Sequence, residues 1–205
     1  MNTSTSTKFS RINRKWRVAD IVVASVIGVA AGLIFFLWNQ IYTPISAPLQ
    51  AALPGAQALV YGIWLIAGVL GGLIIRKPGA ALYTETVAAV VSALLGAQWG
   101  GFLTLESGVV QGLGAEIIFL IFLYSNWRAW VAMLAGAGEG LAMAISDLII
   151  WYPGSKISFA IAYIVSSIIT GAIIAGLGAW FIVKGLATTG VLSRFAAGRE
   201  AKQLV

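Results

Sequence analysis

The sequence contains no cysteine and no histidine among its 205 residues, and only 10% of its residues are charged. Without cysteine, the chain has no disulfide, no thiolate nucleophile and no thiolate metal ligand. Without histidine, it lacks the commonest general base and metal ligand, which excludes HExxH zinc proteases and Ser–His intramembrane proteases. It also has no GxxxxGK[ST] phosphate loop and no nucleophile with a base beside it. We therefore expect a protein that is not an enzyme and that has no metal site and no cofactor.

Charged residues are absent from one long stretch, residues 21–75. A single helix needs about 20 residues to cross the hydrocarbon core of a membrane, so this stretch is long enough for two crossings with a turn between them. Residues 42–56 contain Pro44, Pro48 and Pro54, and proline disrupts the interior of a helix. We therefore place the turn there. Because 60% of all residues are hydrophobic, we also expect membrane-crossing helices in the rest of the chain.

The sequence predicts an all-α integral membrane protein, a bundle of six transmembrane helices. The helices are expected at about 19–41, 57–75, 79–98, 106–124, 128–151 and 157–184. This membrane domain covers residues 16–185. It follows a polar, flexible tail at 1–15 and precedes a basic tail at 186–205.

The positive charges indicate how the bundle is oriented. The net charge is +6, and twelve of the thirteen Lys and Arg residues fall on one side of the predicted membrane. The exception is Lys156, between the last two helices. By the positive-inside rule, both termini are cytoplasmic, and the basic residues orient the protein rather than bind nucleic acid.

Apart from Asp20, near the cytoplasmic end of the first helix, five acidic residues fall inside the predicted helices, where a carboxylate is costly and is a candidate for function. Asp147 and Glu106 lie in the outer half and Glu116 lies near mid-membrane, with Lys156 as the one outer cation. This arrangement favours an outward-facing negative cavity for a cationic or strongly hydrogen-bonding ligand. The alternative is that these acids pair with one another or bond to Ser, Thr and backbone groups.

Aromatic and amide side chains gather in the same half, partly at helical spacing. Tryptophan and tyrosine also collect at membrane interfaces whatever the function, so a belt is the alternative to a ligand site. A pocket of aromatic rings, amides and acids suits a flat cationic aromatic ligand. The candidate substrate-binding residues are Glu116, Asp147, Gln111, Asn39, Trp38, Gln57, Tyr61, Trp64, Gln98, Trp99, Trp151 and Tyr163.

Two of these candidates conflict with each other. Gln111 and Glu116 are five residues apart, about 140° around a regular helix, so they cannot both face one pocket. Either the helix unwinds at Gly112 and Gly114, or one of the two side chains faces a neighbouring helix.

Small residues repeat every four positions at Ala24, Gly28 and Gly32. Such a row lets two helix backbones approach closely inside a membrane. The row is a candidate face for docking a partner subunit, and packing within the bundle is the alternative.

Several segments resemble the YkoE family of membrane substrate-binding subunits, the S components of energy-coupling factor (ECF) vitamin transporters. They are Trp38-Asn39, GVLGGLIIRKPGAALYTE at 68–85, LLGAQWG at 94–100 and SGVVQGLGAE at 107–116. The resemblance implies six helices in a bacterial cell membrane and capture of thiamine or its hydroxymethylpyrimidine precursor from outside. It also implies a small-residue docking face on the first helix and two kinds of partner, a membrane coupling subunit and ATPase subunits.

Two other functions remain open from the sequence. One is a small secondary transporter for a cationic solute, driven by protons through Glu116, Glu139 and Asp147. The other is a structural or assembly protein of the membrane that binds no ligand.

The predicted orientation can be tested with single cysteines, because the chain has none of its own. We expect Ser155→Cys to react with a membrane-impermeant thiol reagent in intact cells. Ser193→Cys should react only after permeabilisation, since it lies in the basic segment that we place inside. Labelling of position 193 from outside would reverse the topology.

Overall fold

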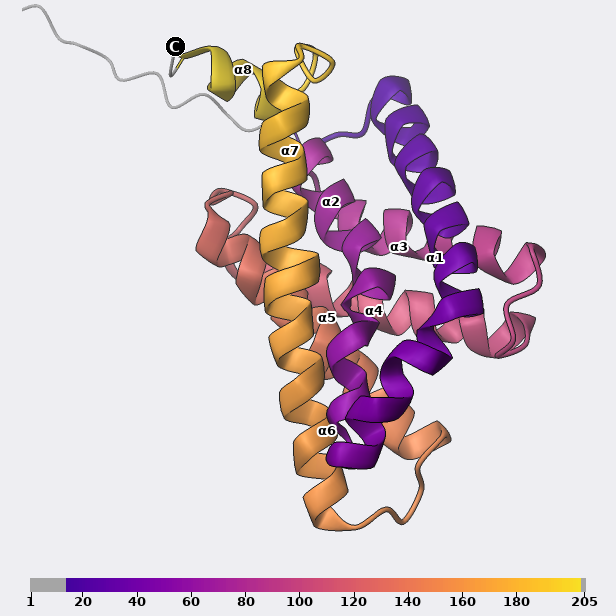
Figure 1. Ribbon diagram of the computed structural model, residues 1–205. Helices are drawn as coiled ribbons and strands as arrows, with labels where there is room; N and C mark the ends of the chain where they lie inside the picture. The colour runs from indigo at the N-terminus through magenta and orange to yellow at the C-terminus, as the bar shows by residue number, and fades with distance from the viewer. Residues whose placement is uncertain (1–13, 204–205) are drawn as a thin grey trace, which may run out of the picture.

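The fold is all-helical in a computed structural model that describes residues 14–203 (Figure 1). Most of the predicted tail at 1–15 lies outside the described residues. The helices are α1 (Val18–Ala52), η1 (Ala56–Leu65), α2 (Ile66–Ile75), α3 (Ala80–Leu94), α4 (Gly101–Ile121), α5 (Ala129–Ile150), α6 (Ile157–Thr170), η2 (Gly171–Leu177), α7 (Gly178–Thr188) and α8 (Ala196–Gln203). Of these, η1 is a 3₁₀-helix and η2 a π-helix.

Five helical stretches are long and apolar enough to cross a membrane, and α3 is a sixth, shorter apolar helix of 15 residues. At 1.5 Å per residue, α3 is only about 22 Å long. The remaining elements join in two places: η1 continues into α2, and α6, η2 and α7 form one continuous rod (Figure 1). The prediction of an all-helical membrane protein with six apolar helices is confirmed.

The first helix is longer than predicted. We expected it to end near residue 41, but α1 continues through Pro44 and Pro48 to Ala52. A proline inside a helix removes one backbone hydrogen bond and kinks the helix without always ending it. Figure 1 shows α1 changing direction in its second half. The connection to η1 is therefore only a short turn around Pro54 and Gly55, whose φ of 107° suits glycine.

The centre of the bundle is α3, which packs against α1, α2 and α4. The row of Ala24, Gly28 and Gly32 is buried and faces α3. A methyl group on Gly28 would lie 2.7 Å from the Val87 side chain and 3.0 Å from the backbone oxygen of Thr84. The prediction that this row forms a docking face is wrong, because the row packs inside the bundle.

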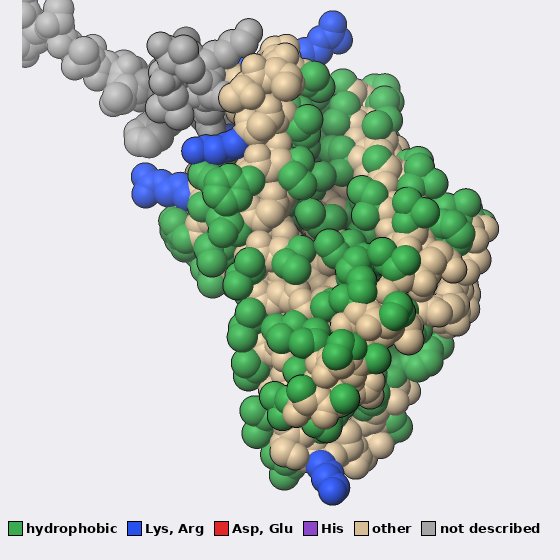
Figure 2. Space-filling model, viewed as in Figure 1, with side chains coloured by type: hydrophobic (Ala, Val, Ile, Leu, Met, Phe, Trp, Pro, Cys, Tyr) green, Lys and Arg blue, Asp and Glu red, His purple; other side chains and the backbone are tan. Residues whose placement is uncertain are grey.

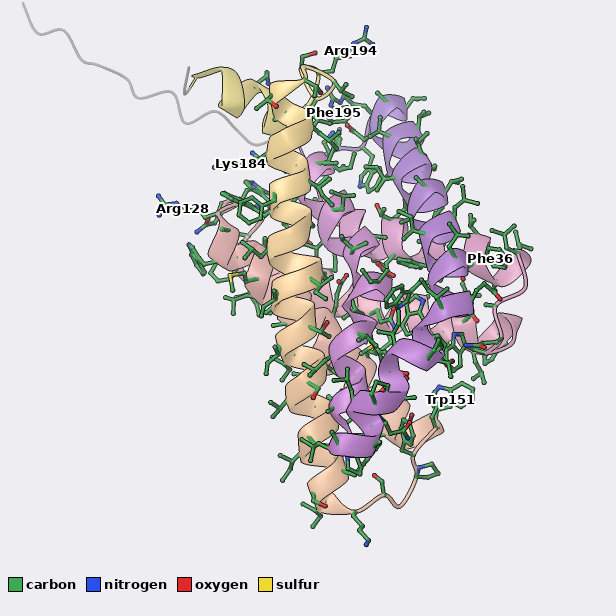
Figure 3. All side chains as sticks on the ribbon, viewed as in Figure 1. Phe36, Arg128, Trp151, Lys184, Arg194 and Phe195 are labelled. Carbon is green, nitrogen blue, oxygen red and sulfur yellow. The ribbon has the colours of Figure 1, made fainter. Side chains whose placement is uncertain are left out.

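Charge is separated from the apolar middle of the molecule. In Figure 2, apolar side chains cover the visible face and Lys and Arg appear only at its two ends. Figure 3 places Arg128, Lys184 and Arg194 toward the end that carries α8, with Trp151 toward the opposite end. The first described residues also lie at the α8 end, where Arg14 donates to the Leu123 carbonyl at 3.2 Å.

The predicted C-terminal tail at 186–205 is partly folded against the bundle. After α7 the chain turns at Gly190 and continues into α8. Leu192 and Phe195 are buried in the main apolar cluster, with 4% and 6% of their surfaces exposed. The sequence predicted only a basic tail, and these two side chains anchor it to the bundle.

We predict that Gly28→Leu destabilises the protein. The larger side chain would collide with Val87 and the α3 backbone, and overpacking of this kind costs about 1–3 kcal/mol or more. The melting temperature in detergent should fall, whereas Val29→Leu should leave it unchanged because Val29 is 44% exposed on the outer face of α1. An unaltered melting temperature for Gly28→Leu would restore the docking interpretation of the row.

Candidate functional site

A cavity of about 100 Å³ lies between η1, α1, α3, α4, α5 and α6. One buried water needs about 10–15 Å³, so the cavity holds far more than a single solvent molecule. Its lining residues are Phe35, Asn39, Tyr61, Trp64, Glu85, Ala89, Ser92, Trp99, Thr104, Ser107, Gly108, Gln111, Met143, Asp147, Trp151, Tyr152 and Tyr163. Trp151 is 41% exposed and lies toward the end of the molecule opposite α8 (Figure 3).

Aromatic rings form one side of the cavity as a connected chain. Trp64 lies 5.2 Å from Tyr61 and 6.0 Å from Trp99, measured between ring centroids, and Trp99 lies 6.0 Å from Trp151. Tyr42 packs behind this chain, 4.9 Å from Trp64. The contacts are edge-on or tilted, which holds the rings in place and leaves ring faces for another aromatic group.

Hydrogen bonds fix the polar groups at two points of the wall. Asn39 accepts a bond from Trp64 Nε1 at 2.9 Å and donates to Ser92 Oγ at 3.2 Å, which links α1, η1 and α3. On the other side, Tyr163 Oη donates to Asp147 Oδ2 at 2.5 Å. Tyr152 lies outside the helices in the α5–α6 connection, and burial raises the pKa of its hydroxyl, so it stays neutral.

Glu85 forms the deep end of the cavity. It is fully buried and accepts a hydrogen bond from the Gly68 backbone nitrogen at 2.6 Å through Oε2. Its other carboxyl oxygen is buried and has no hydrogen-bond partner in the described part of the chain. A carboxyl in this position can form a hydrogen bond or an ion pair with a molecule that enters the cavity.

The structure gathers eight of the twelve predicted site residues around this one cavity. They are Asn39, Tyr61, Trp64, Trp99, Gln111, Asp147, Trp151 and Tyr163. Their convergence is a geometric finding, and a ligand-binding role for them is developed below as a proposal.

Glu116 is not at this cavity. Its carboxylate accepts bonds from the backbone nitrogens of Gly79, Ala81 and Leu82 at 2.5, 3.0 and 3.3 Å. It also accepts a bond from Tyr124 Oη at 2.6 Å. These donors are the free amides at the start of α3, where a carboxylate is favoured by the helix dipole. The prediction for Glu116 failed because α4 runs from Gly101 to Ile121 and not from 106 to 124, which moves Glu116 from the middle of the helix to its last turns.

The same result resolves the conflict between Gln111 and Glu116. The α4 helix is continuous through Gly112 and Gly114, so it does not unwind there. Gln111 lines the cavity, and Glu116 faces the α2–α3 connection.

Three other predicted residues also lie elsewhere. Gln57 accepts a bond from the Gly55 nitrogen at 2.7 Å and stabilises the turn between α1 and η1. Gln98 is exposed in the α3–α4 connection, and Trp38 is half-buried on α1 outside the cavity lining. Gln98 and Trp38 were predicted together with their sequence neighbours Trp99 and Asn39. The prediction was wrong for these two because adjacent residues point in different directions.

Sequence reasoning missed the small and polar residues of α3 and α4 that line the cavity. Glu85, Ala89 and Ser92 recur at helical spacing on α3, and Thr104 and Gly108 share a face of α4 with the predicted Gln111. That periodicity was available as a signal. It was obscured because alanine, serine and glycine are as common in helix packing as in binding sites. Phe35, Ser107, Met143 and Tyr152 complete the missed set.

Comparison with known proteins assigns the chain to a family of transporters. Residues 19–142 match the family model "ABC-type cobalt transport system, permease component". The chain is 37% identical over 194 residues to the Bacillus subtilis (strain 168) protein named "Putative HMP/thiamine permease protein YkoE", covering 93% of this chain and 94% of that protein. It also superimposes on the crystal structure of an S component of an ECF transporter, with a TM-score of 0.84, 37% identity and coverage of 92% and 94% of the two chains. Among residues 14–203 no cluster of three or more His, Cys, Asp or Glu side chains could hold a metal ion.

We predict that Glu116→Ala lowers the stability of the bundle. The substitution leaves three backbone amides and the Tyr124 hydroxyl without their shared acceptor. A hydrogen bond to a charged group contributes about 1.5–3 kcal/mol. The melting temperature in detergent should drop clearly for Glu116→Ala and less for Glu116→Gln, which keeps one acceptor oxygen. Equal melting temperatures for all three proteins would show that this contact does not hold α3 in place.

Proposed function

The chain belongs to the family of ECF transporter S components that includes the Bacillus subtilis YkoE protein, and from this premise we propose that it captures thiamine or its hydroxymethylpyrimidine precursor from outside the cell. An S component is a membrane-embedded substrate-binding subunit and not an enzyme. It is a multi-pass protein of the cell membrane.

The observation that carries this proposal is the composition of the cavity, which combines aromatic rings with two acids. Thiamine has an aminopyrimidine ring and a positively charged thiazolium ring. Trp64, Trp99 and Trp151 provide faces for stacking and for cation–π contact. Glu85 and Asp147 provide the negative groups. Gln111 and Asn39 add amides that can donate to or accept from a pyrimidine.

Energy for transport comes, in this proposal, from partners. ECF membership implies an energy-coupling module, which we take to be a membrane coupling subunit with ATPase subunits. The chain contains no phosphate loop of its own. The row of Ala24, Gly28 and Gly32 is occupied by α3, so the partner meets a different surface.

A proton-driven secondary transporter is less well supported by the geometry. Such a transporter needs a series of acids that carry protons across the membrane, and Glu116 would be one of them. Glu116 is instead held by three backbone donors at the start of α3 and by the Tyr124 hydroxyl. Uptake that stops on ATP depletion and survives an uncoupler would favour the S component, and the reverse result would favour the secondary transporter.

We predict that the purified protein retains thiamine or hydroxymethylpyrimidine, identified by mass spectrometry, and rebinds it in calorimetry. Trp99→Ala should weaken thiamine binding by about 2- to 30-fold, because a cation–π contact contributes about 0.5–2 kcal/mol. Asp147→Asn should weaken it by about 10- to 150-fold, since a hydrogen bond to a charged group contributes about 1.5–3 kcal/mol.

Trp130→Ala is the matched control for these substitutions. Trp130 is 44% exposed, packs on Phe122 at 5.1 Å and does not line the cavity, so its loss should leave binding unchanged. The assignment of the cavity fails if Trp99→Ala and Asp147→Asn bind thiamine as tightly as the parent protein.

A further inference from the structure

A second buried acid, on helix α5, lies near Glu85. Glu139 has no exposed surface, and neither of its carboxyl oxygens has a hydrogen-bond partner in the described part of the chain. It does not line the cavity, whereas Met143, Asp147 and Trp151 do so on the same face of α5. Glu139 therefore lies on the same face of α5 as these residues, beneath the cavity lining.

Glu85 and Glu139 converge on the backbone of Gly68. A methyl group at Gly68 would lie 2.1 Å from Glu139 Oε1 and 3.3 Å from Glu85 Oε2. A side chain at this position would displace the Glu139 carboxyl, so glycine allows both carboxyls to lie here as they do. The two acids therefore form a pair that spans α3 and α5 across α2, and we call Glu85 and Glu139 the acid pair.

No basic side chain can neutralise this pair from the surrounding helices. The sequences of α1, η1, α2, α3, α4, α5 and α6 contain no Lys and no Arg. An uncompensated carboxylate in an apolar interior is so costly that the group takes up a proton instead. Two neighbouring carboxylates would add mutual repulsion to that cost.

We propose, on the premise of the proposed function, that both members of the acid pair are protonated while the cavity is empty and that a cationic ligand expels the proton of Glu85 alone. The O–H bond of Glu85 breaks, its proton leaves through the cavity to water, and the resulting carboxylate pairs with the ligand's positive charge. Glu139 has no opening to the cavity, so it keeps its proton and remains neutral beside the Glu85 carboxylate. Glu85 is the binding residue, and Glu139 is the neutral acid beside it.

Other titratable groups face this region and could also release protons. Asp147 is the closest competitor, because it lines the cavity with one oxygen bonded to Tyr163. Glu106 accepts a bond from Ser146 at 2.8 Å, and Glu116 is held at the start of α3. The remaining titratable groups on the helices around the pair are Asp20, Tyr42, Tyr61, Tyr83 and Tyr163, and Tyr152 lies in the α5–α6 connection.

This proton exchange would distinguish thiamine from hydroxymethylpyrimidine, the two compounds in the name of the Bacillus subtilis relative. Thiamine carries a permanent positive charge, and hydroxymethylpyrimidine lacks the charged thiazolium ring. Thiamine competes with the Glu85 proton, so its affinity rises as the pH rises, by up to about tenfold per pH unit for one proton released. The affinity for the neutral ligand does not follow this slope.

The test counts protons in two ways on the full-length protein in detergent. Infrared spectra of the ligand-free protein should contain carbonyl bands of two protonated carboxyls, one lost in Glu85→Gln and the other in Glu139→Gln. Calorimetry in two buffers of different ionisation enthalpy should show release of close to one proton per thiamine and none per hydroxymethylpyrimidine. On thiamine binding, the Glu85 band should disappear and the Glu139 band should stay.

Three variants show which acid releases the proton. Glu139→Gln imitates a protonated acid, so it should still release one proton and bind thiamine within a few fold of the parent protein. Glu85→Gln should release none and weaken thiamine binding at least tenfold. Asp147→Asn should release one proton although its affinity falls. Proton release that disappears in Asp147→Asn but persists in Glu85→Gln overturns the proposal, as does a ligand-free protein without the two infrared bands.

Failure of the proposed function gives a different result. If neither thiamine nor hydroxymethylpyrimidine binds and both infrared bands are present, the ligand assignment is wrong and the protonated acid pair stands. If thiamine binds without releasing a proton, the ligand assignment stands and the exchange is wrong.

Discussion

A polar group inside a membrane protein has to find its partner within the chain, because the hydrocarbon around it offers none. Two acids of this protein meet that requirement at one end of the bundle. Asp20 forms ion pairs with Arg17 and Lys77, and Glu116 accepts bonds from the first amides of α3. Lys77 also donates to the Lys15 carbonyl, and Trp16 donates to the Pro78 carbonyl. Together these contacts tie the described N-terminal segment, the α2–α3 connection and α4 to one another.

Glycine meets a second requirement, the close approach of backbones where no side chain separates the helices. A methyl group on Gly136 would lie 2.1 Å from the Gly171 carbonyl, and one on Gly140 would lie 2.1 Å from the Ser167 carbonyl. These contacts press α5 against α6 and the π-helical segment η2. Such close contact leaves no space for a ligand on that side. The cavity lies where α3 and α4 present the small residues Ala89, Ser92 and Gly108 and the opposite wall is built from large rings.

The sequence predicted the parts of this protein that depend on composition and charge. The six apolar helices followed from the uncharged stretches and the prolines, although Pro44 and Pro48 lie within α1 and did not mark its end. The aromatic and amide side of the cavity was also predicted, because Trp and Tyr gathered near one membrane face. The depth of each residue within the membrane was harder to predict. An error of five residues at the start of α4 misplaced Glu116, and no rule from sequence alone says whether a row of small residues faces lipid or another helix.

The six acids whose side chains the structure describes divide according to whether the fold provides them with hydrogen-bond partners. Asp20 and Glu116 have several donors each, and these bonds favour the folded state. Glu139 has none, and Glu85 has a single backbone donor. An apolar residue at either position would remove a buried polar group, and such replacements are often neutral or stabilising. Stability therefore gives no reason for the acid pair. Both carboxyls approach the backbone of Gly68 in the first turn of α2, so these poorly satisfied polar groups lie at the end of the cavity. A bundle selected for stability alone would not concentrate its unsatisfied polar atoms there, whereas a binding protein needs groups whose partner arrives with the ligand.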